Sequence, residues 1–269
     1  MGCDYSGVVS DVARYDDLNG QEIPKGKLAL VGLGPGYVKQ ITPAALEALG
    51  ESDVIIGYKL YLRQIKDLVD QTRVQEFPMG KEQERALEAF RLALEGLKVA
   101  VVTGGDAGIF DMAAPVFELI AEMEPDERSL VEVEVIPGIT ALNMAASMVG
   151  SPLAQDFAVI SLSDRFVPWD QIERRLDAVA GADMVIALYE PSSKHRPGQL
   201  GKAQEILLKH RDASTPVTVA REVTQPSEKI GITTVERMTE LEHDKRTVII
   251  VGNSKTRSVG EWMITPRAY

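Results

Sequence analysis

The chain has 269 residues, and 40 acidic against 29 basic side chains give it a formal net charge of −11. This acidic balance argues against a general nucleic-acid binder, which needs a basic face. One cysteine and three histidines leave little for a disulfide or a dedicated zinc site, and no apolar run reaches membrane-span length or forms a signal peptide. We therefore expect a cytoplasmic protein without a resident metal that binds neither membrane nor nucleic acid.

Residues 1–25 are predicted to form a mobile or peripheral arm, because they lack periodicity and contain Asn19-Gly20 and Pro24 as breakers. Residues 1–6 also match the short N-myristoylation pattern, with Cys3 placed where a second acyl chain could be attached. That pattern is short and requires a eukaryotic enzyme, so we favour the arm.

From residue 27 onward, apolar runs of strand length alternate with helical patterns, which predicts an α/β fold. Thr42 and Pro43 are typical of a helix start. In the first half we expect strands at 28–33, 54–57, 99–103 and 131–136, and helices at 43–49, 60–69, 83–94 and 113–123.

The connections between strands become shorter after Pro137-Gly138, which predicts a second sheet of mixed direction. We expect strands at 158–162, 184–189, 217–221 and 247–251, a further segment of unassigned type at 230–235, and helices at 141–149, 169–179 and 200–210. The simplest division is two α/β domains, residues 26–137 and 138–269, with a ligand cleft between them.

The first glycine-rich loop, GLGPG at 32–36, directly follows a buried strand. A dinucleotide-binding loop would need glycine where Tyr37 stands and an acidic residue at the end of the second strand, near Gly57. Both features are absent, so a Rossmann site is disfavoured. A purely structural turn remains an equal alternative for this loop.

Further loops that end predicted strands carry polar or small residues, at 103–110 (TGGDAGIF), 136–141 (IPGITA), 161–164 (SLSD) and 188–191 (LYEP). Open α/β sheets place ligands at such carboxyl ends. Asp106 could accept hydrogen bonds from a ligand, or it could cap a nearby helix or turn.

Taken together in this order, the five motifs resemble the tetrapyrrole (class III) methyltransferases over residues 27–269. Within that family, GYKLY at 57–61, SLSD followed by Pro168-Trp169, and ITPR at 264–267 are most similar to the branch that methylates C17 of precorrin-3B or cobalt-factor III in cobalamin biosynthesis and contracts the ring. Tyr37 and Glu190 depart from the family pattern, in which Asp and Met or Asn are common.

The resemblance implies a homodimer that uses S-adenosyl-L-methionine as methyl donor and a tetrapyrrole as substrate. It also implies that the cofactor is held mainly by main-chain groups. The residues carried over as cofactor-binding are Pro35, Gly104, Gly105, Asp106, Ile109, Thr140, Ala141, Tyr189 and Glu190.

Ring contraction requires a positioned acid or base. The candidate catalytic residues are Asp106, Ser163, Asp164, Tyr189 and Lys59. Each has a structural alternative: Tyr189 could be core packing, Asp164 a turn cap and Lys59 a solvated helix start. Of the histidines, His195 follows the YEP loop and is a minor candidate for metal contact or proton transfer at the substrate edge, whereas His210 and His243 are expected to be solvated.

An acidic protein with a polycarboxylate substrate needs a local basic surface. We expect a basic rim at the substrate entrance, drawn from Lys59, Arg63, Lys81, Arg85, Arg165, Lys194 and Arg196. The alternative is that these are scattered surface charges.

Other functions stay open from the sequence alone. They are a class III methylase acting on another corrinoid carbon or on a substrate such as diphthine, a Rossmann-type methyltransferase, and a non-catalytic tetrapyrrole carrier or scaffold.

Overall fold

The computed structural model describes residues 25–267, so the predicted arm, including Cys3, lies almost wholly outside it. The chain forms two compact units that divide between Thr140 and Ala141. No helix within the described range combines the length and apolar character that crossing a membrane requires.

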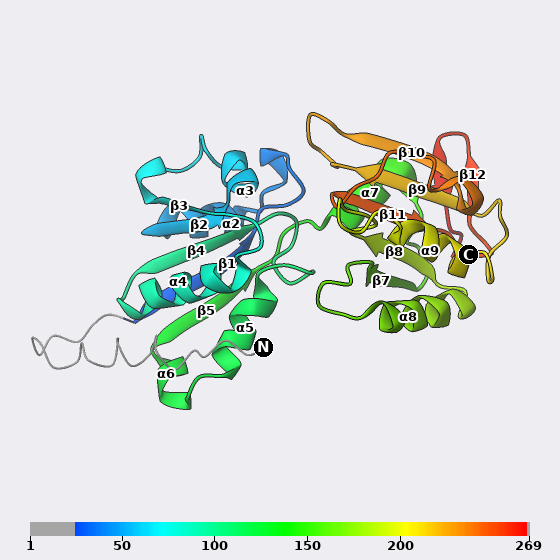
Figure 1. Cartoon of the computed structure of the whole chain (residues 1–269). Coiled ribbons are helices and arrows are strands. Elements are labelled where there is room, and N and C mark those ends of the chain that lie inside the picture. The colour runs from blue at the N-terminus through cyan, green and yellow to red at the C-terminus, as the bar shows by residue number, and fades with distance from the viewer. Residues whose placement is uncertain (1–24, 268–269) are drawn as a thin grey trace, which may run out of the picture. The chain divides into compact units, whose positions relative to one another are not determined.

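Unit 1, up to Thr140, is built on a five-stranded sheet in the order β3-β2-β4-β1-β5 (Figure 1). All its strand pairs are parallel, as the alternating pattern predicts. The strands are β1 (Gly26–Gly32), β2 (Val54–Tyr58), β3 (Val74–Phe77), β4 (Lys98–Thr103) and β5 (Val131–Ile136). The helices are α2 (Pro43–Glu51), α3 (Lys59–Gln64), α4 (Glu82–Leu94), α5 (Ala113–Ala121) and α6 (Pro125–Ser129).

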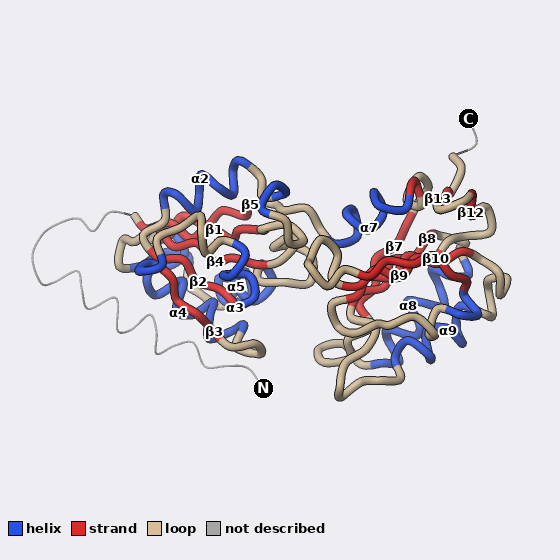
Figure 2. The backbone as a smooth tube through the Cα atoms, turned by 90° about the horizontal axis from the view of Figure 1, so that it is seen from above, coloured by secondary structure: helices blue, strands red, loops and turns tan. Residues whose placement is uncertain are grey.

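Both faces of this sheet are covered, as buried parallel strands require. On one face, α4 and α5 pack with alternate residues of the strands, such as Leu30 and Val101. On the other face, α2 and α3 pack with the intervening residues, such as Val31 and Val102. Figure 2 shows α2 and α4 on opposite sides of the sheet.

The strand order excludes the Rossmann alternative, whose strands run 3-2-1-4-5-6. Here β1 lies between β4 and β5. The chain leaves β1 toward the face that α2 covers, and it leaves β4 toward the face that α5 covers. Neighbouring strands with connections to opposite faces mark the place where open α/β sheets bind ligands.

Unit 2, from Ala141, contains a five-stranded sheet in the order β10-β9-β11-β8-β7. The predicted mixed direction is confirmed, because β7 and β8 are parallel whereas the other pairs are antiparallel. The strands are β7 (Phe157–Ser161), β8 (Val185–Tyr189), β9 (Pro216–Arg221), β10 (Lys229–Thr234) and β11 (Thr247–Val251). The helices are α7 (Ala141–Val149), α8 (Trp169–Gly181) and α9 (Gln199–Leu207).

In this unit α7 covers one face of the sheet, and α8 and α9 cover the other (Figure 2). A second, small sheet joins β6 (Gly150–Ser151), β12 (Arg257–Val259) and β13 (Trp262–Ile264). Met263 of β13 is fully buried in the core beside α7.

Several expected elements need correction. The helix expected over 60–69 ends at Gln64, and the chain then turns into β3, which the pattern did not predict. A strand of four residues, none of them buried, is too short for a periodic signal. The strands β6, β12 and β13 are equally short, and they are defined by their hydrogen-bonded pairing with one another. Helix α6 is also absent from the predicted elements, although the sequence contains a helix-start signal there. Pro125 follows Glu124, and Glu124 forms a capping box with Glu127.

Candidate active site

Three loops of unit 1 meet at the carboxyl edge of its sheet, because the strands before them are aligned in register. Gly32 of β1 lies beside Thr103 of β4, and Val31 lies beside Ile136 of β5. Beyond these ends, the loops of β1 and β4 pair directly: Gly34 and Gly105 exchange main-chain hydrogen bonds of 3.0 and 2.8 Å. The sequence motifs GLGPG, GGDAGIF and PGITA are therefore one assembly of main chain.

Glycine is needed here chiefly for the packing of the loops on one another. A Cβ atom on Gly138 would lie 2.1 Å from the carbonyl oxygen of Gly105, and one on Gly32 would lie 2.6 Å from the nitrogen of Gly138. Such distances are far inside van der Waals contact. Gly34 also has a φ of 76°, which other residues seldom adopt.

The Asp106 carboxylate fastens two of these loops. Its Oδ1 accepts a hydrogen bond from the main-chain N–H of Gly108 at 2.8 Å, and its Oδ2 accepts one from Gly138 at 3.0 Å. The first bond closes a turn, which was the structural alternative for this residue. Asp106 thus positions the loop, and each of its oxygens retains a second lone pair for a ligand.

Residues from the GYKLY motif border the second loop. A Cβ on Gly104 would lie 2.5 Å from the ring of Tyr61, and the rings of Tyr58 and Tyr61 meet edge to face with centroids 5.7 Å apart. Lys59, between them, is exposed. Of the other carried-over residues in unit 1, Pro35 is half-buried, Thr140 is buried and Ile109 is exposed.

A buried hydroxyl at the end of β4 has no hydrogen-bond partner within residues 25–267. It belongs to Thr103, which is fully buried directly before Gly104. Buried polar groups are normally satisfied. This orphaned oxygen therefore marks a position where a ligand could donate a hydrogen bond.

In unit 2, the ends of β7 and β8 bring SLSD and YEP together, with Ser161 in register with Tyr189. The Tyr189 carbonyl accepts from the Leu162 N–H at 2.9 Å. The Tyr189 hydroxyl accepts from the Leu142 N–H at 3.0 Å, in the first turn of α7. Tyr189 and Ala141 are thus placed together, and one function of the tyrosine is to satisfy a helix start.

Asp164 and Glu190 share one arginine. The Arg196 guanidinium lies 3.1 Å from Glu190 and 3.7 Å from Asp164, and the Gln199 side chain donates to Asp164 at 2.8 Å. These contacts fix the position of both carboxylates. Ser163, beside them, is half-buried, and its hydroxyl has no partner among the residues that the structure describes.

The loop between β9 and β10 contributes residues that the sequence reasoning missed. Since β8 and β9 are both antiparallel to β11, this loop leaves the same sheet edge as Tyr189. Glu222 and Thr224 have positive φ values of 49° and 64°, and Glu190 has 48°. Non-glycine residues in this conformation store strain and cluster at functional sites. No local sequence signal predicts such backbone angles.

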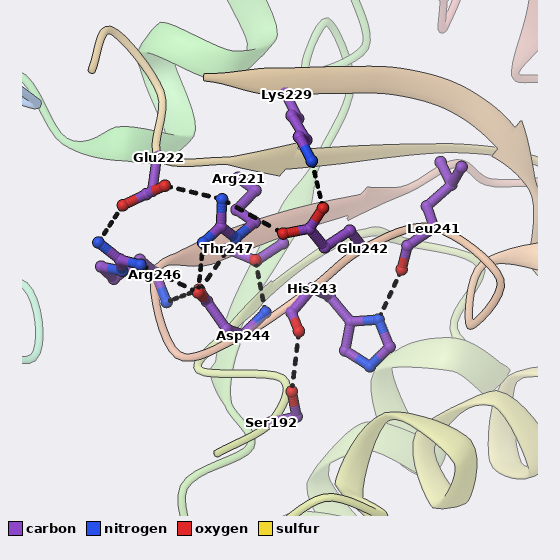
Figure 3. Close-up of polar contacts among 10 residues, drawn as sticks. All are labelled: Ser192, Arg221, Glu222, Lys229, Leu241, Glu242, His243, Asp244, Arg246 and Thr247. Carbon is purple, nitrogen blue, oxygen red and sulfur yellow. Dashed lines mark hydrogen bonds and ion pairs between the residues drawn. The ribbon is translucent and has the colours of Figure 1, made fainter. Parts of the chain in front are cut away.

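An ion-pair network holds that strained loop (Figure 3). Glu222 lies between Arg221, at 2.7 Å, and Arg246. Asp244 accepts from both arginines, and Arg221 also approaches Glu242. The Thr224 hydroxyl at the centre of the loop is buried and has no partner in the described chain.

The residues of the expected basic rim differ in exposure and in pairing. Lys59, Arg63, Arg165 and Lys194 are exposed, whereas Lys81 pairs with Glu84 and Arg196 with Glu190. Arg85 is 3% exposed and is not a surface charge at all. Its position on the buried face of α4 overrides its polarity.

The histidines differ from one another. His195 is exposed, in keeping with its minor candidacy. His210 is not simply solvated, because its Nε2 lies 2.8 Å from Asp177; this hydrogen bond lowers the pKa of Asp177. His243 Nδ1 contacts the Leu241 carbonyl at 2.7 Å. Within residues 25–267 no group of three or more His, Cys, Asp or Glu side chains could hold a metal ion.

Comparison with known proteins decides the family. Residues 27–239 match the family model of the tetrapyrrole (corrin/porphyrin) methylases. This chain is a tetrapyrrole methylase. Its assembly of glycine-rich loops at a parallel sheet edge is therefore that of a methyltransferase.

Two curated relatives of this methylase carry more specific names. It is 43% identical over 245 residues to the cobalt-factor III methyltransferase of Priestia megaterium, covering 91% of this chain and 45% of that protein. The chain thus spans about half the length of this relative. It is also 41% identical over 249 residues to the precorrin-3B C(17)-methyltransferase of a Sinorhizobium species, covering 91% and 97%.

Solved structures agree on the fold. The methyltransferase CobJ superposes with a TM-score of 0.83 at 37% identity, over 90% of this chain and 100% of that one. A uroporphyrin-III C-methyltransferase from Thermus thermophilus, solved with S-adenosylhomocysteine, gives 0.64 at 24% identity, over 84% and 97%.

Proposed function

We propose that this tetrapyrrole methylase transfers a methyl group from S-adenosyl-L-methionine to C17 of precorrin-3B or cobalt-factor III, with contraction of the ring, in cobalamin biosynthesis. The observation that carries the proposal is the match along nearly the whole length of the Sinorhizobium C(17)-methyltransferase. A homodimer in the cytoplasm is part of the same proposal; the homodimer rests on the sequence resemblance, and the cytoplasmic location rests on the composition of the chain.

The residues of unit 1 fit the proposed methyl donor. Main-chain groups of Gly104, together with the orphaned Thr103 hydroxyl, offer hydrogen-bonding partners at the sheet edge, whereas those of Gly105 already pair with Gly34. Pro35 and Ile109, which are half-buried and exposed, supply apolar surface around them.

The donor, when bound, supplies a methyl group already activated by its positively charged sulfur. The protein is therefore required mainly to align the substrate carbon with that methyl group. A rigid loop assembly suits this task, and the Asp106 hydrogen bonds to Gly108 and Gly138 provide the rigidity.

Proton transfer during ring contraction needs a positioned acid or base, and the five candidates differ in how far the fold already uses them. Asp106, Asp164 and Tyr189 each accept hydrogen bonds within their own units. The Lys59 ammonium and the Ser163 hydroxyl have no partner in the described chain, so a structural role does not compete with catalysis at either of them. Lys59→Met and Ser163→Ala are the variants that separate them.

The decisive experiment incubates the purified protein with S-adenosyl-L-methionine and each of the two substrates. The expected result is a product one methyl group heavier, with the absorbance change of a contracted ring and label from a methyl-labelled donor at C17. Methylation at another carbon would contradict the C17 assignment. Tight tetrapyrrole binding without methylation and without S-adenosylhomocysteine binding would instead indicate a carrier.

A further inference from the structure

Arg85 is a buried arginine whose charge the described chain leaves uncompensated. It lies in the first turn of α4, on the same face as the core residue Ala89, and is 3% exposed. Its Nη2 donates to the Pro78 carbonyl at 3.3 Å, and its buried Nε has no acceptor. No carboxylate of residues 25–267 forms an ion pair with it.

A buried guanidinium normally finds several partners, because removing its charge from water is costly. Arg211, in unit 2, illustrates the ordinary arrangement. It is 7% exposed, donates to the carbonyls of Gly252, Ala180, Met184 and His210, and lies 3.4 Å from Asp183. Arg85 has one carbonyl in place of these five contacts.

The acidic side chains near Arg85 in sequence are committed elsewhere. Glu82 accepts from the Gly80 N–H, and Glu84 pairs with Lys81. Asp106, on the neighbouring loop, binds Gly108 and Gly138. The positive charge is thus held ready for an anion from outside the chain.

Arg85 also lies at the same sheet edge as the candidate active site. Its acceptor Pro78 directly follows β3, whose last residue, Phe77, is in register with Tyr58 of β2. Helices α4 and α5 lie side by side over the sheet (Figure 1), and Ala107 of the GGDAGIF loop belongs to the core that α4 buries. Residues 78–81, which border Arg85, are exposed.

We propose that Arg85 binds a carboxylate side chain of the tetrapyrrole substrate, an inference that rests on the proposed function. Arginine suits this task because its planar fork offers two parallel N–H donors to one carboxylate. The contact anchors the macrocycle at the edge where the methyl group is transferred. It also supplies positive charge inside an acidic protein.

The test compares Arg85→Met with the wild-type protein in binding titrations with three ligands and in thermal unfolding. The ligands are cobalt-factor III, precorrin-3B and S-adenosylhomocysteine. We expect the variant to bind the tetrapyrroles at least about tenfold more weakly and S-adenosylhomocysteine unchanged. The melting temperature should be equal or higher, because an apolar side chain replaces an uncompensated charge. Arg91→Met, on the same helix but paired with Glu88 and Glu95, should bind all ligands like wild type.

The outcomes separate the two proposals. Equal tetrapyrrole binding by Arg85→Met and wild type, or a lower melting temperature with unchanged binding, overturns the Arg85 assignment and leaves the proposed function intact. A wild-type protein that binds S-adenosylhomocysteine but no tetrapyrrole overturns both. Should Arg85→Met not fold, Arg85→Lys keeps the charge without the fork; it should bind tetrapyrroles several-fold more weakly, and unchanged binding overturns the assignment.

Discussion

Single side chains fix the geometry of the loops at the sheet edge of unit 1. Asp106 holds two main-chain N–H groups, and Gly138 lies so close to Gly105 that no side chain fits between them. From their positions in strand-end loops alone, these residues would be interpreted only as ligand contacts. Their first effect is on the shape of the main chain, and binding depends on that shape.

Asp106→Ala is expected to lower the free energy of unfolding by about 2 kcal/mol, because two N–H groups lose their acceptor. S-Adenosylhomocysteine binding should weaken with it. Asp106→Asn keeps one acceptor oxygen and should lose less of both. Urea unfolding and calorimetric titration measure the two effects, and an Ala variant with wild-type stability and affinity would remove Asp106 from the site.

Gly138→Ala is expected to cost about 3 kcal/mol or more, since its Cβ would collide with the main chain of Gly105. The matched control is Gly50→Ala in α2, where nothing lies within 4 Å of the new Cβ. That control should be neutral or gain up to about 1 kcal/mol through helix propensity. Urea unfolding of both variants is the measurement, and equal effects would refute the close approach.

At the scale of elements, helix starts and strand ends are tied to one another by side chains from distant segments. In unit 2, Tyr189 at the end of β8 reaches the first turn of α7, and Arg196 gathers Glu190 and Asp164. Such ties orient a loop without adding to the core.

Tyr189→Phe removes the hydroxyl that accepts from Leu142, so the free energy of unfolding should fall by about 1 kcal/mol, as for the loss of a helix cap. Denaturant unfolding and turnover are measured together. A stability equal to wild type with a hundredfold loss of turnover would show that the hydroxyl acts on the substrate instead.

The network at the β9–β10 loop predicts acid sensitivity. Burial opposes ionisation of Asp244, but hydrogen bonds from the Arg246 N–H and Arg221, together with their charges, hold its pKa below the ordinary 3.8. A carboxylate with a lowered pKa stabilises the folded state above its unfolded pKa, and this contribution is lost as the pH falls through the folded value.

Stability should therefore fall below about pH 4, the unfolded pKa of an aspartate. Asp244→Asn should be less stable at neutral pH and show a shallower acid loss in thermal melts. Parallel pH profiles for variant and wild type would count against the network.

Considered as a whole molecule, the chain contains two units with separate hydrophobic cores. Leu176 on α8 is fully buried in the core of unit 2. Leu176→Ala should cost about 3 kcal/mol. By hydrogen exchange, we expect amides of β8 and β9 to lose protection while those of β1 and β4 retain it. Equal loss in both units would mean that they unfold as one.

The net charge of −11 also acts at this scale, since a polycarboxylate substrate is repelled by an acidic surface. Four of the seven expected rim residues are exposed, and Arg85 contributes from inside the fold. The capacity of this protein to bind an anion therefore depends on which Lys and Arg side chains are paired with carboxylates, and less on how many there are.

The sequence by itself determined the α/β class, the parallel sheet, the Thr42 cap and the methylase family, because these depend on local periodicity and on motifs read along the chain. Only the tertiary structure decided the strand order, the short strands β3, β6, β12 and β13, the double use of Asp106 and the burial of Arg85. The physical reason is that strand pairing, burial and hydrogen-bond partners join residues far apart in the chain. Local pattern carries no record of which distant group fills a given space.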